Sequence, residues 1–349
     1  RLWPWVLQLL CEDVFSYSSA LSTMSWPKAL DLLQQMRPLD VHPNLITYNG
    51  FMDVCQKTGE WRVALQLLEV STADCITYNS IIAACQASGE LMIALSLLAE
   101  MHVQRLFAVV VTYNSAIAVC QRRGNWTDAL QLLNSMCHEQ LLPDVISYSS
   151  ILSVCEVAAT WTMALRVLED FEPDLFSFNS AISACDKGGQ LSLARGLLDT
   201  MLQAAVLPDV VTFNGLLSAS AKDREWWATL QFLSKMHAFS QPRNIITYNS
   251  AIHACSEIWV LSLKFLGSLT GSRISSDLIT YGSLLSGLQT TAQWRRAIHM
   301  ALDQQNMITC EILANACDAG NAFLPLLRFL STMEPRALCR LLELPDFAG

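Results

Sequence analysis

The sequence predicts an all-α protein, an α-solenoid of about nine to ten stacked helical hairpins. A pattern of about 35 residues, with shorter copies near 30, recurs along the 349-residue chain. Inside each copy the apolar residues are spaced by three and four, as on one face of a helix. Because one hairpin cannot bury its own apolar faces, neighbouring copies must stack and share a core.

Cysteines mark the register of the repeat. Six of them recur with an aromatic residue seven positions before each: Cys55, Cys85, Cys120, Cys155, Cys185 and Cys255. A free cysteine behaves as a small buried hydrophobe, so we expect these side chains to pack in the core. The sequence has no C-x-x-C and no H-x-E motif, so it offers no ligand set for zinc. Tryptophans at 26, 61, 126, 161, 226 and 294 share one position at the start of the second helix, and we expect them to pack as well.

Each copy divides into two helices. In the copy that starts at residue 45, the first helix carries Tyr48, Phe51 and Cys55, and the second carries Trp61 and Leu68. Hydroxyl residues stand where an N-cap is expected: Thr47, Thr77, Thr112, Ser147 and Thr212. Gly59, Gly89, Gly124 and Gly189 mark the turn between the two helices, and Pro43, Pro143, Pro173 and Pro208 end the preceding segment.

This register divides the whole chain. Nine repeats are expected at residues 14–44, 45–74, 75–109, 110–144, 145–174, 175–209, 210–244, 245–277 and 278–306. Residues 1–13 align with the second helix of an earlier copy, which is expected of a truncated repeat. Residues 307–349 hold a degenerate repeat and a Leu-rich tail, expected to cap the stack.

Composition excludes some classes of protein. Apolar residues make up 52% of the chain and charged residues 15%, which is too apolar for a disordered protein. No run of about 20 apolar residues predicts a membrane span. The sequence contains no phosphate-binding glycine loop and no nucleophile elbow, and its histidines recur at no useful spacing, so we expect no catalysis and no cofactor. The net charge of −9 is the opposite of a basic strip for nucleic acid.

One polar position recurs directly after the aromatic residue that opens each first helix. It is occupied by Ser18, Asn49, Asn79, Asn114, Ser149, Asn179, Asn214 and Asn249, and by Gly282 in the weakest copy. These side chains can satisfy backbone N–H groups of the first helical turn. Because each helix already has a hydroxyl cap two residues earlier, a polar row along one continuous groove is the favoured interpretation.

At these residues the sequence resembles the pentatricopeptide repeat family. The resemblance depends on the string that opens each copy, as in VVTYNSAIAVCQRRG at 110–124 and IITYNSAIHAC at 245–255, followed by A-L-x-L-L and a closing P-D or P-N. It covers essentially the whole chain. It implies a right-handed superhelix that binds single-stranded RNA. It also implies that two or three side chains of each repeat recognise one base, which is typical of this family.

The resemblance also implies which residues recognise the bases. One is the Asn or Ser that follows the aromatic residue of the first helix, and the other is the last residue of the same repeat, called the closing residue. Together they are called the recognition pair. Asn with Asp favours U, Ser with Asn favours A, Ser with Asp favours G, and Asn with Asn accepts pyrimidines. The pairs are Ser18 with Asn44, Asn49 with Asp74, Asn114 with Asp144, Ser149 with Asp174, Asn179 with Asp209, Asn214 with Asn244, and Asn249 with Asp277.

With the N-terminus at the 5′ end, these pairs give the hypothetical target 5′-AUNUGUYUN. Asn79 with Val109 and Gly282 with Asn306 assign no base. The copies near 30 residues lack part of the turn or second helix, a shortening that can displace their closing residue.

Two further sets follow from the resemblance. Base-stacking wedges are expected three positions before the polar residue, at Phe15, Ile46, Ile76, Val111, Ile146, Phe176, Val211, Ile246 and Ile279, with burial in the core as the alternative. Cations near the RNA phosphates are expected at Lys57, Arg122, Lys187 and Lys222, whereas Ala87, Val157, Glu257 and Thr290 stand at that position in other copies.

The sequence therefore predicts a sequence-specific binder of single-stranded RNA that acts in organellar RNA processing, stability, editing or translation without its own catalysis. The resemblance implies a mitochondrial or chloroplast location and an RNA-processing enzyme as a recruited partner. The alternative is a protein-binding helical-repeat scaffold, for which the acidic balance favours a basic partner.

Overall fold

The computed structural model describes residues 18, 20–21, 23–36, 43–68, 74–271, 274 and 276–290. Throughout these residues the regular elements are helices. The chain divides into two compact units, Arg1–Ala184 and Cys185–Gly349, which are described separately.

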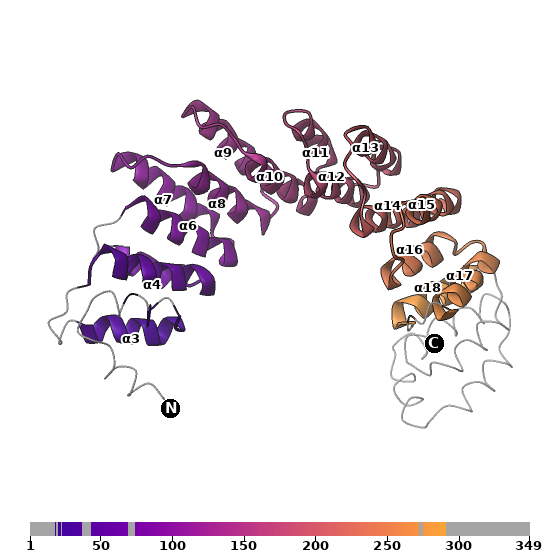
Figure 1. The fold of residues 1–349 in the computed structure, drawn as a ribbon, viewed down its shortest axis with the longest axis horizontal. Helices are drawn as coiled ribbons and strands as arrows, with labels where there is room; N and C mark the ends of the chain where they lie inside the picture. Colours follow the sequence, from indigo (N-terminus) through magenta and orange to yellow (C-terminus); the bar gives the residue numbers. More distant parts are fainter. Residues whose placement is uncertain are drawn as a thin grey trace, which may run out of the picture. The chain divides into compact units, whose positions relative to one another are not determined.

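In the first unit, the first helices of successive hairpins lie side by side (Figure 1). They are α4 (Leu45–Thr58), α6 (Cys75–Ser88), α8 (Val110–Gln121) and α10 (Val145–Val157). The second helices are α3 (Trp26–Met36), α5 (Trp61–Leu68), α7 (Leu91–Val103), α9 (Trp126–His138) and α11 (Trp161–Leu168). α6 packs between α4 and α8, and α8 packs between α6 and α10, so the first helices form a continuous row. The helix α12 (Leu175–Lys187) spans the boundary of the units.

The second unit repeats this arrangement. Its elements are α13 (Leu191–Gln203), α14 (Val210–Lys222), α15 (Trp226–Ala238), α16 (Ile245–Ala254), α17 (Trp259–Gly271) and α18 (Leu278–Thr290). The first helices α14, α16 and α18 pack in order, and each second helix contacts the first helix that follows it. The predicted α-solenoid of stacked helical hairpins is confirmed within each unit.

The recurring cysteines lie in the core, as predicted. All six are fully buried, together with ring positions such as Tyr78, Tyr113 and Phe213. Burial raises the pKa of the Cys55 thiol to about 12, with a smaller contribution from the charge of Glu60. These cysteines are therefore neutral packing groups.

The tryptophan position differs from its prediction. Trp61, Trp126 and Trp161 are only half-buried, and Trp226 is exposed. Each is the first residue of a second helix, where the small residue three positions later, such as Ala64, Ala129 or Ala164, takes the buried place. Trp294 lies outside the described residues.

The predicted N-caps are wrong by three residues. The cap of α6 is Asp74, whose carboxylate accepts from the backbone N–H of Thr77, while the Thr77 hydroxyl faces the backbone N–H of Asp74. This reciprocal pair is a capping box, with the acidic residue at the N-cap and the hydroxyl residue at N3. The same geometry starts α4 at Asn44, α10 at Asp144, α14 at Asp209 and α16 at Asn244. Each first helix thus begins about one turn earlier than its aromatic residue.

The hairpin turns follow the prediction. Gly59, Gly89, Gly124 and Gly189 have φ between 64° and 74°, a left-handed conformation that glycine adopts without strain. Where glycine is missing, Ala159 and Arg224 adopt the same conformation. The second helices α7 and α9 are followed likewise by Arg105 and Gln140 in this conformation.

The repeats 45–74 and 145–174 owe their shortness to a shorter second helix. α5 and α11 have 8 residues each, whereas α7 and α9 have 13. The repeat boundaries given above stay a prediction. The segments 1–13 and 307–349, with Phe15 and Asn306, lie outside the described residues.

Candidate nucleic-acid interface

Within each unit, exposed apolar side chains recur along the first helices. The eight described wedge positions, Ile46, Ile76, Val111, Ile146, Phe176, Val211, Ile246 and Ile279, are between 54% and 65% exposed. Each occupies the second residue of its helix. They are therefore not part of the core, the alternative that the sequence left open.

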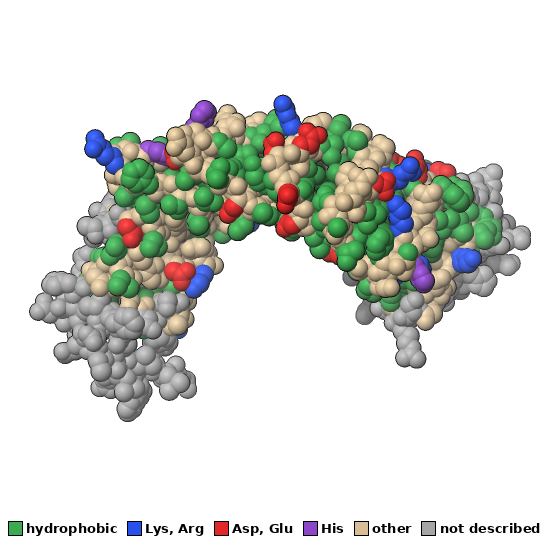
Figure 2. Space-filling model, turned by 45° about the horizontal axis from the view of Figure 1, so that its top comes forward, with side chains coloured by type: hydrophobic (Ala, Val, Ile, Leu, Met, Phe, Trp, Pro, Cys, Tyr) green, Lys and Arg blue, Asp and Glu red, His purple; other side chains and the backbone are tan. Residues whose placement is uncertain are grey.

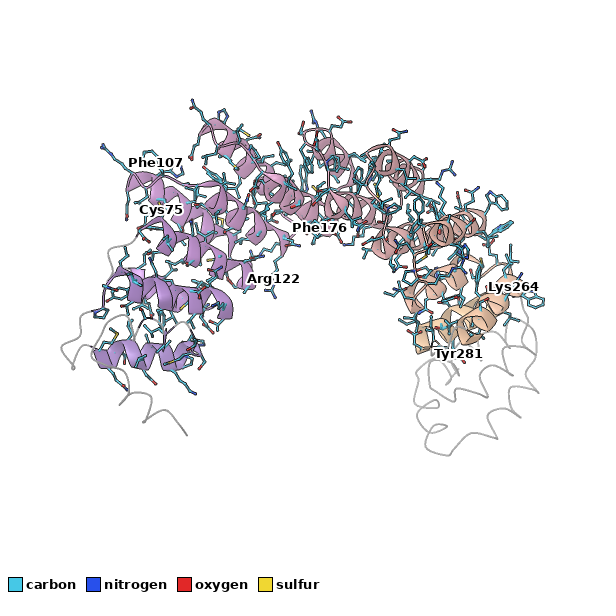
Figure 3. All side chains as sticks on the ribbon, in the orientation of Figure 1. Cys75, Phe107, Arg122, Phe176, Lys264 and Tyr281 are labelled. Carbon is cyan, nitrogen blue, oxygen red and sulfur yellow. The ribbon has the colours of Figure 1, made fainter. Side chains whose placement is uncertain are left out.

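The polar position lies three residues later, so one helical turn places it on the same face as the wedge. Asn49, Asn79, Asn114, Asn214 and Asn249 are half-buried, as are Ser149 and Asn179. Ser18 is half-buried in helical backbone. In Figure 3, Phe176 points away from the ribbon of α12, which illustrates the wedge position.

The closing residue of a repeat lies beside the polar residue because it is the N-cap of the next first helix. Asn114 Nδ2 is 3.1 Å from Asp144 Oδ1, and Asn249 Nδ2 is 3.1 Å from Asp277 Oδ1. Asn49 Nδ2 is 3.5 and 3.4 Å from the two carboxylate oxygens of Asp74. These three recognition pairs are thus brought together.

The expected displacement in shorter repeats does not occur in two described cases. The repeats 45–74 and 245–277 are both short, yet their pairs Asn49–Asp74 and Asn249–Asp277 are in hydrogen-bond contact. In the repeat 45–74 the second helix α5 has only 8 residues, yet α6 packs on α4 and brings its N-cap beside Asn49. In the repeat 245–277 the second helix α17 has 13 residues and the first helix α16 has 10.

Hydrogen bonds lower the pKa of the paired aspartates. For Asp74, burial raises the pKa, but the Thr77 N–H and hydroxyl and the Asn49 amide together outweigh it. Asp144 and Asp277 have lowered pKa values from the same balance of burial against hydrogen bonds. Each of these pairs therefore combines an amide donor with an ionised carboxylate acceptor at neutral pH.

Two pairs have a different geometry. In the repeat with Val109 as N-cap there is no carboxylate, and among the described residues Asn79 Oδ1 is buried without a hydrogen-bond partner. Ser149 donates its hydroxyl to the Ile146 carbonyl of its own helix at 3.1 Å, while Asp174 is held by Ser177.

The predicted phosphate-contacting cations have unequal surroundings. Lys57 forms an exposed ion pair with Asp53 one turn earlier, at 2.6 Å. Lys222 is held more firmly, since its Nζ is 2.9 Å from both the carboxylate and the backbone carbonyl of Asp186. Arg122 and Lys187 are exposed, and Figure 3 shows Arg122 at the C-terminal end of α8.

Charge is dispersed on the faces visible in Figure 2. Apolar side chains cover large areas, and Lys and Arg are scattered among them. The shown faces of the described units thus carry no basic strip, in agreement with the net charge of −9.

A pocket of about 400 Å³ opens between α14, α16 and α18. It is lined by the wedges Ile246 and Ile279, by Asn249, and by Lys222. Four polar lining residues were not expected from the sequence: Ser218, Ser250, His253 and Ser283. Ser218 and His253 follow the polar position by four residues, a spacing that gives the signal by which they could have been found.

Other kinds of site have no support in the described part of the chain. No group of three or more His, Cys, Asp or Glu side chains there can hold a metal ion. None of the helices described is long and apolar enough to cross a membrane.

Comparison with known structures supports the fold. The chain is similar to the pentatricopeptide repeat protein PPR10 from maize, with a TM-score of 0.65 and 22% sequence identity over 95% of this chain and 56% of that one. PPR10 in complex with an 18-nt psaJ RNA element matches with a TM-score of 0.49 and 21% identity, over 93% of this chain and 54% of that one. The chain therefore spans about half the length of these solved relatives. No curated protein matches the sequence.

Family models match the repeats themselves. Residues 108–156 match the PPR repeat family, and residues 72–123 and 167–223 match the pentatricopeptide repeat domain. These segments include the capping boxes at Asp74, Asp144 and Asp209 and the exposed wedges Ile76, Val111, Ile146, Phe176 and Val211. Together these matches cover residues 72–156 and 167–223, and this part of the chain is similar to pentatricopeptide repeats in sequence.

Proposed function

We propose that this protein binds single-stranded RNA by sequence, with one base at each repeat along the row of first helices. The observation that carries the proposal is the recurrence, at one position per hairpin, of an exposed apolar side chain one helical turn from a half-buried polar residue. Exposed apolar groups can cover the faces of unstacked bases, while the pair offers hydrogen bonds to a base edge.

The pocket between α14, α16 and α18 supports the binding of a base at the repeat of Asn249. Its lining includes Asn249 and two wedges, Ile246 and Ile279, which come from successive first helices. A base that enters there is flanked by one aliphatic side chain on each face and meets an amide at its edge. Such a compartment suits a flat ring better than an extended peptide.

The proposed target is 5′-AUNUGUYUN, and the protein acts by occupancy of that site. Occupancy can protect RNA from nucleases, change its structure or recruit a processing enzyme. A role in organellar RNA processing, in a mitochondrion or chloroplast, is part of the proposal and is supported by the family alone. No catalytic role is proposed for any described residue.

Selection from a randomised RNA pool tests the function. We expect enrichment of sequences with U at the steps of Asn49, Asn114 and Asn249, where an amide is paired with a carboxylate. The variant Asn114→Ser with Asp144→Asn should change the preferred base at its own step from U to A and leave the other steps unchanged. An unchanged preference there would contradict the base assignments even if RNA is bound.

A protein-binding scaffold is the competing function. The net charge of −9 and the pairing of Lys57 and Lys222 with acidic groups favour a basic partner. If no RNA sequence is enriched at low salt, where electrostatic binding is strongest, the RNA proposal is contradicted in favour of this scaffold.

A further inference from the structure

We infer that the buried hydroxyl residue at N3 of a first helix is, in four described repeats, a positioning residue for the base-recognising amide of the preceding repeat. This inference rests on the proposed function. The hydroxyl residues are Thr47, Thr77, Thr112, Ser147, Ser177, Thr212, Thr247 and Thr280, and all eight are fully buried. Their first role is to complete the capping box of their own helix.

A second contact of the same hydroxyl crosses to the preceding hairpin. Four amides are within short hydrogen-bond distance of it through Oδ1. The pairs are Thr77 with Asn49 at 2.7 Å, Ser147 with Asn114 at 2.6 Å, Thr247 with Asn214 at 2.8 Å and Thr280 with Asn249 at 2.5 Å. Serine and threonine serve equally, so the hydroxyl and not the methyl group makes this contact.

The contact of the amide with the N3 hydroxyl also occurs where the closing residue is not an aspartate. Asn214 lies beside the capping box of Asn244, which has no carboxylate, and it is still held by Thr247. In the repeat 45–74, the hydroxyl of Thr77 is closer to Asn49 Oδ1 than either Asp74 oxygen is to Asn49 Nδ2. The hydroxyl has one hydrogen and two acceptors within reach, Asn49 Oδ1 at 2.7 Å and Asp74 Oδ1 at 2.8 Å, and the amide oxygen is the nearer of the two.

Fixing the amide decides what a base meets. With Oδ1 directed to the hydroxyl, the Nδ2 group lies on the side of the carboxylate and supplies the N–H donors of the pair. The reversed amide would direct Oδ1 toward the Asp74 carboxylate. An N–H donor next to a carboxylate acceptor matches uracil, which offers carbonyl oxygens and an N3–H, and mismatches cytosine, which offers an N3 acceptor and an amino group.

The repeat with Val109 provides an internal contrast. Thr112 is as buried as Thr77, and its hydroxyl accepts from the backbone N–H of Val109 at 3.1 Å. Asn79 Oδ1, by contrast, has no hydrogen-bond partner among the described residues. Thr112 thus has the capping role without the positioning role.

This contrast gives a matched experiment with Thr77→Val and Thr112→Val. Both remove a fully buried capping hydroxyl and keep the side-chain shape, so both should lower the thermal stability similarly. We measure the dissociation constants for 5′-AUNUGUYUN and for the same RNA with C at the second nucleotide, the step of Asn49. Thr77→Val should reduce the preference for U over C there by about fivefold, the value of one hydrogen bond.

Thr112→Val should leave the U over C preference at the second nucleotide unchanged, and Thr77→Ser, which keeps the hydroxyl, should retain it. If Thr77→Val does not fold, Ser147→Ala at the step of Asn114 provides the same measurement at the fourth nucleotide with a smaller change of shape. Equal losses of affinity for U and C in the hydroxyl-deleted variants would overturn the positioning role while leaving the proposed function intact. A wild-type protein that binds U and C equally at these steps would overturn the proposed function and this inference together.

Discussion

The Asn114 amide nitrogen lies 3.1 Å from Oδ1 of Asp144, which is 30 residues later in the chain and belongs to the next hairpin. Asp144 is also the N-cap of α10 and accepts from the backbone N–H of Ser147 at 2.8 Å. One carboxylate therefore stabilises a helix, joins two hairpins and forms half of a recognition pair. Different substitutions of Asp144 should therefore change the stability of the protein and its preference among bases separately.

Asp144→Ala should destabilise the protein, whereas Asp144→Asn should not. Asparagine caps helices as well as aspartate does, as Asn44 and Asn244 illustrate in this chain, while loss of a cap to alanine costs about 1 kcal/mol. Urea unfolding followed by circular dichroism measures the difference. Equal destabilisation by both substitutions would show that the charge, and not the cap, is what α10 requires.

Val109→Asp should create a recognition pair where none exists. The new carboxylate would cap α8, which has no side-chain cap, and would lie beside the Asn79 amide. We expect a preference for U at the third nucleotide of the target, where the wild type has none, and a gain in stability of about 1 kcal/mol from the cap. Competition binding with the four bases at that nucleotide measures the effect, with Val109→Asn as the control that adds a cap without a charge.

Stability should decrease on acidification. Folding lowers the pKa values of Asp74, Asp144 and Asp277. The ionised carboxylates therefore stabilise the folded protein at a pH above their unfolded-state pKa of about 3.9, and this stabilisation is lost as the pH falls through their folded-state pKa values. The thermal midpoint should therefore fall between about pH 5 and pH 3. The double variant Asp74→Asn with Asp144→Asn keeps both caps and should lose less over the same interval. An identical fall in this variant would contradict the assignment to these carboxylates.

Ile146→Ser should weaken RNA binding without unfolding the protein. The side chain is 61% exposed, so its removal costs little in the free protein, but it forfeits the apolar surface that a base would cover. We expect about a fivefold loss of affinity, equivalent to about 1 kcal/mol. Ile151→Ser, in the same helix but fully buried, should instead lower the thermal midpoint strongly. Unchanged RNA affinity in Ile146→Ser would argue against a stacking role.

The salt dependence of RNA binding should be shallow. Four phosphate contacts would give a log–log slope of about −3, and the retention of Lys222 by Asp186 should reduce its magnitude to about 2. Asp186→Asn should weaken this retention and steepen the slope by about 0.7. Asp53→Asn should change it little, because the Lys57–Asp53 pair is exposed and such pairs contribute little. A slope unaffected by Asp186→Asn would mean that Lys222 does not contact phosphate.

Periodicity was sufficient to predict much of this molecule. The spacing of Cys55 and its counterparts gave the repeat length, the helical hairpins and the buried positions. Glycines such as Gly59 gave the turns, because a left-handed residue is needed to reverse the chain there. The N-cap was placed wrongly because Thr47 and Asn44 are both good capping residues, and a sequence does not show which of them lies outside the helix.

The sequence by itself determined the α-solenoid, its core and the row of polar residues, since these follow from local spacing on helical faces. Tertiary structure decided which residues meet across hairpins. Only the packing of successive first helices places Asp144 and Ser147 against Asn114, excludes Ile146 from the core and binds Lys222 to Asp186. Such contacts depend on how one hairpin packs on the next. The periodicity of the sequence does not show how far apart two residues some 30 positions apart lie, or which of them donates a hydrogen bond to the other.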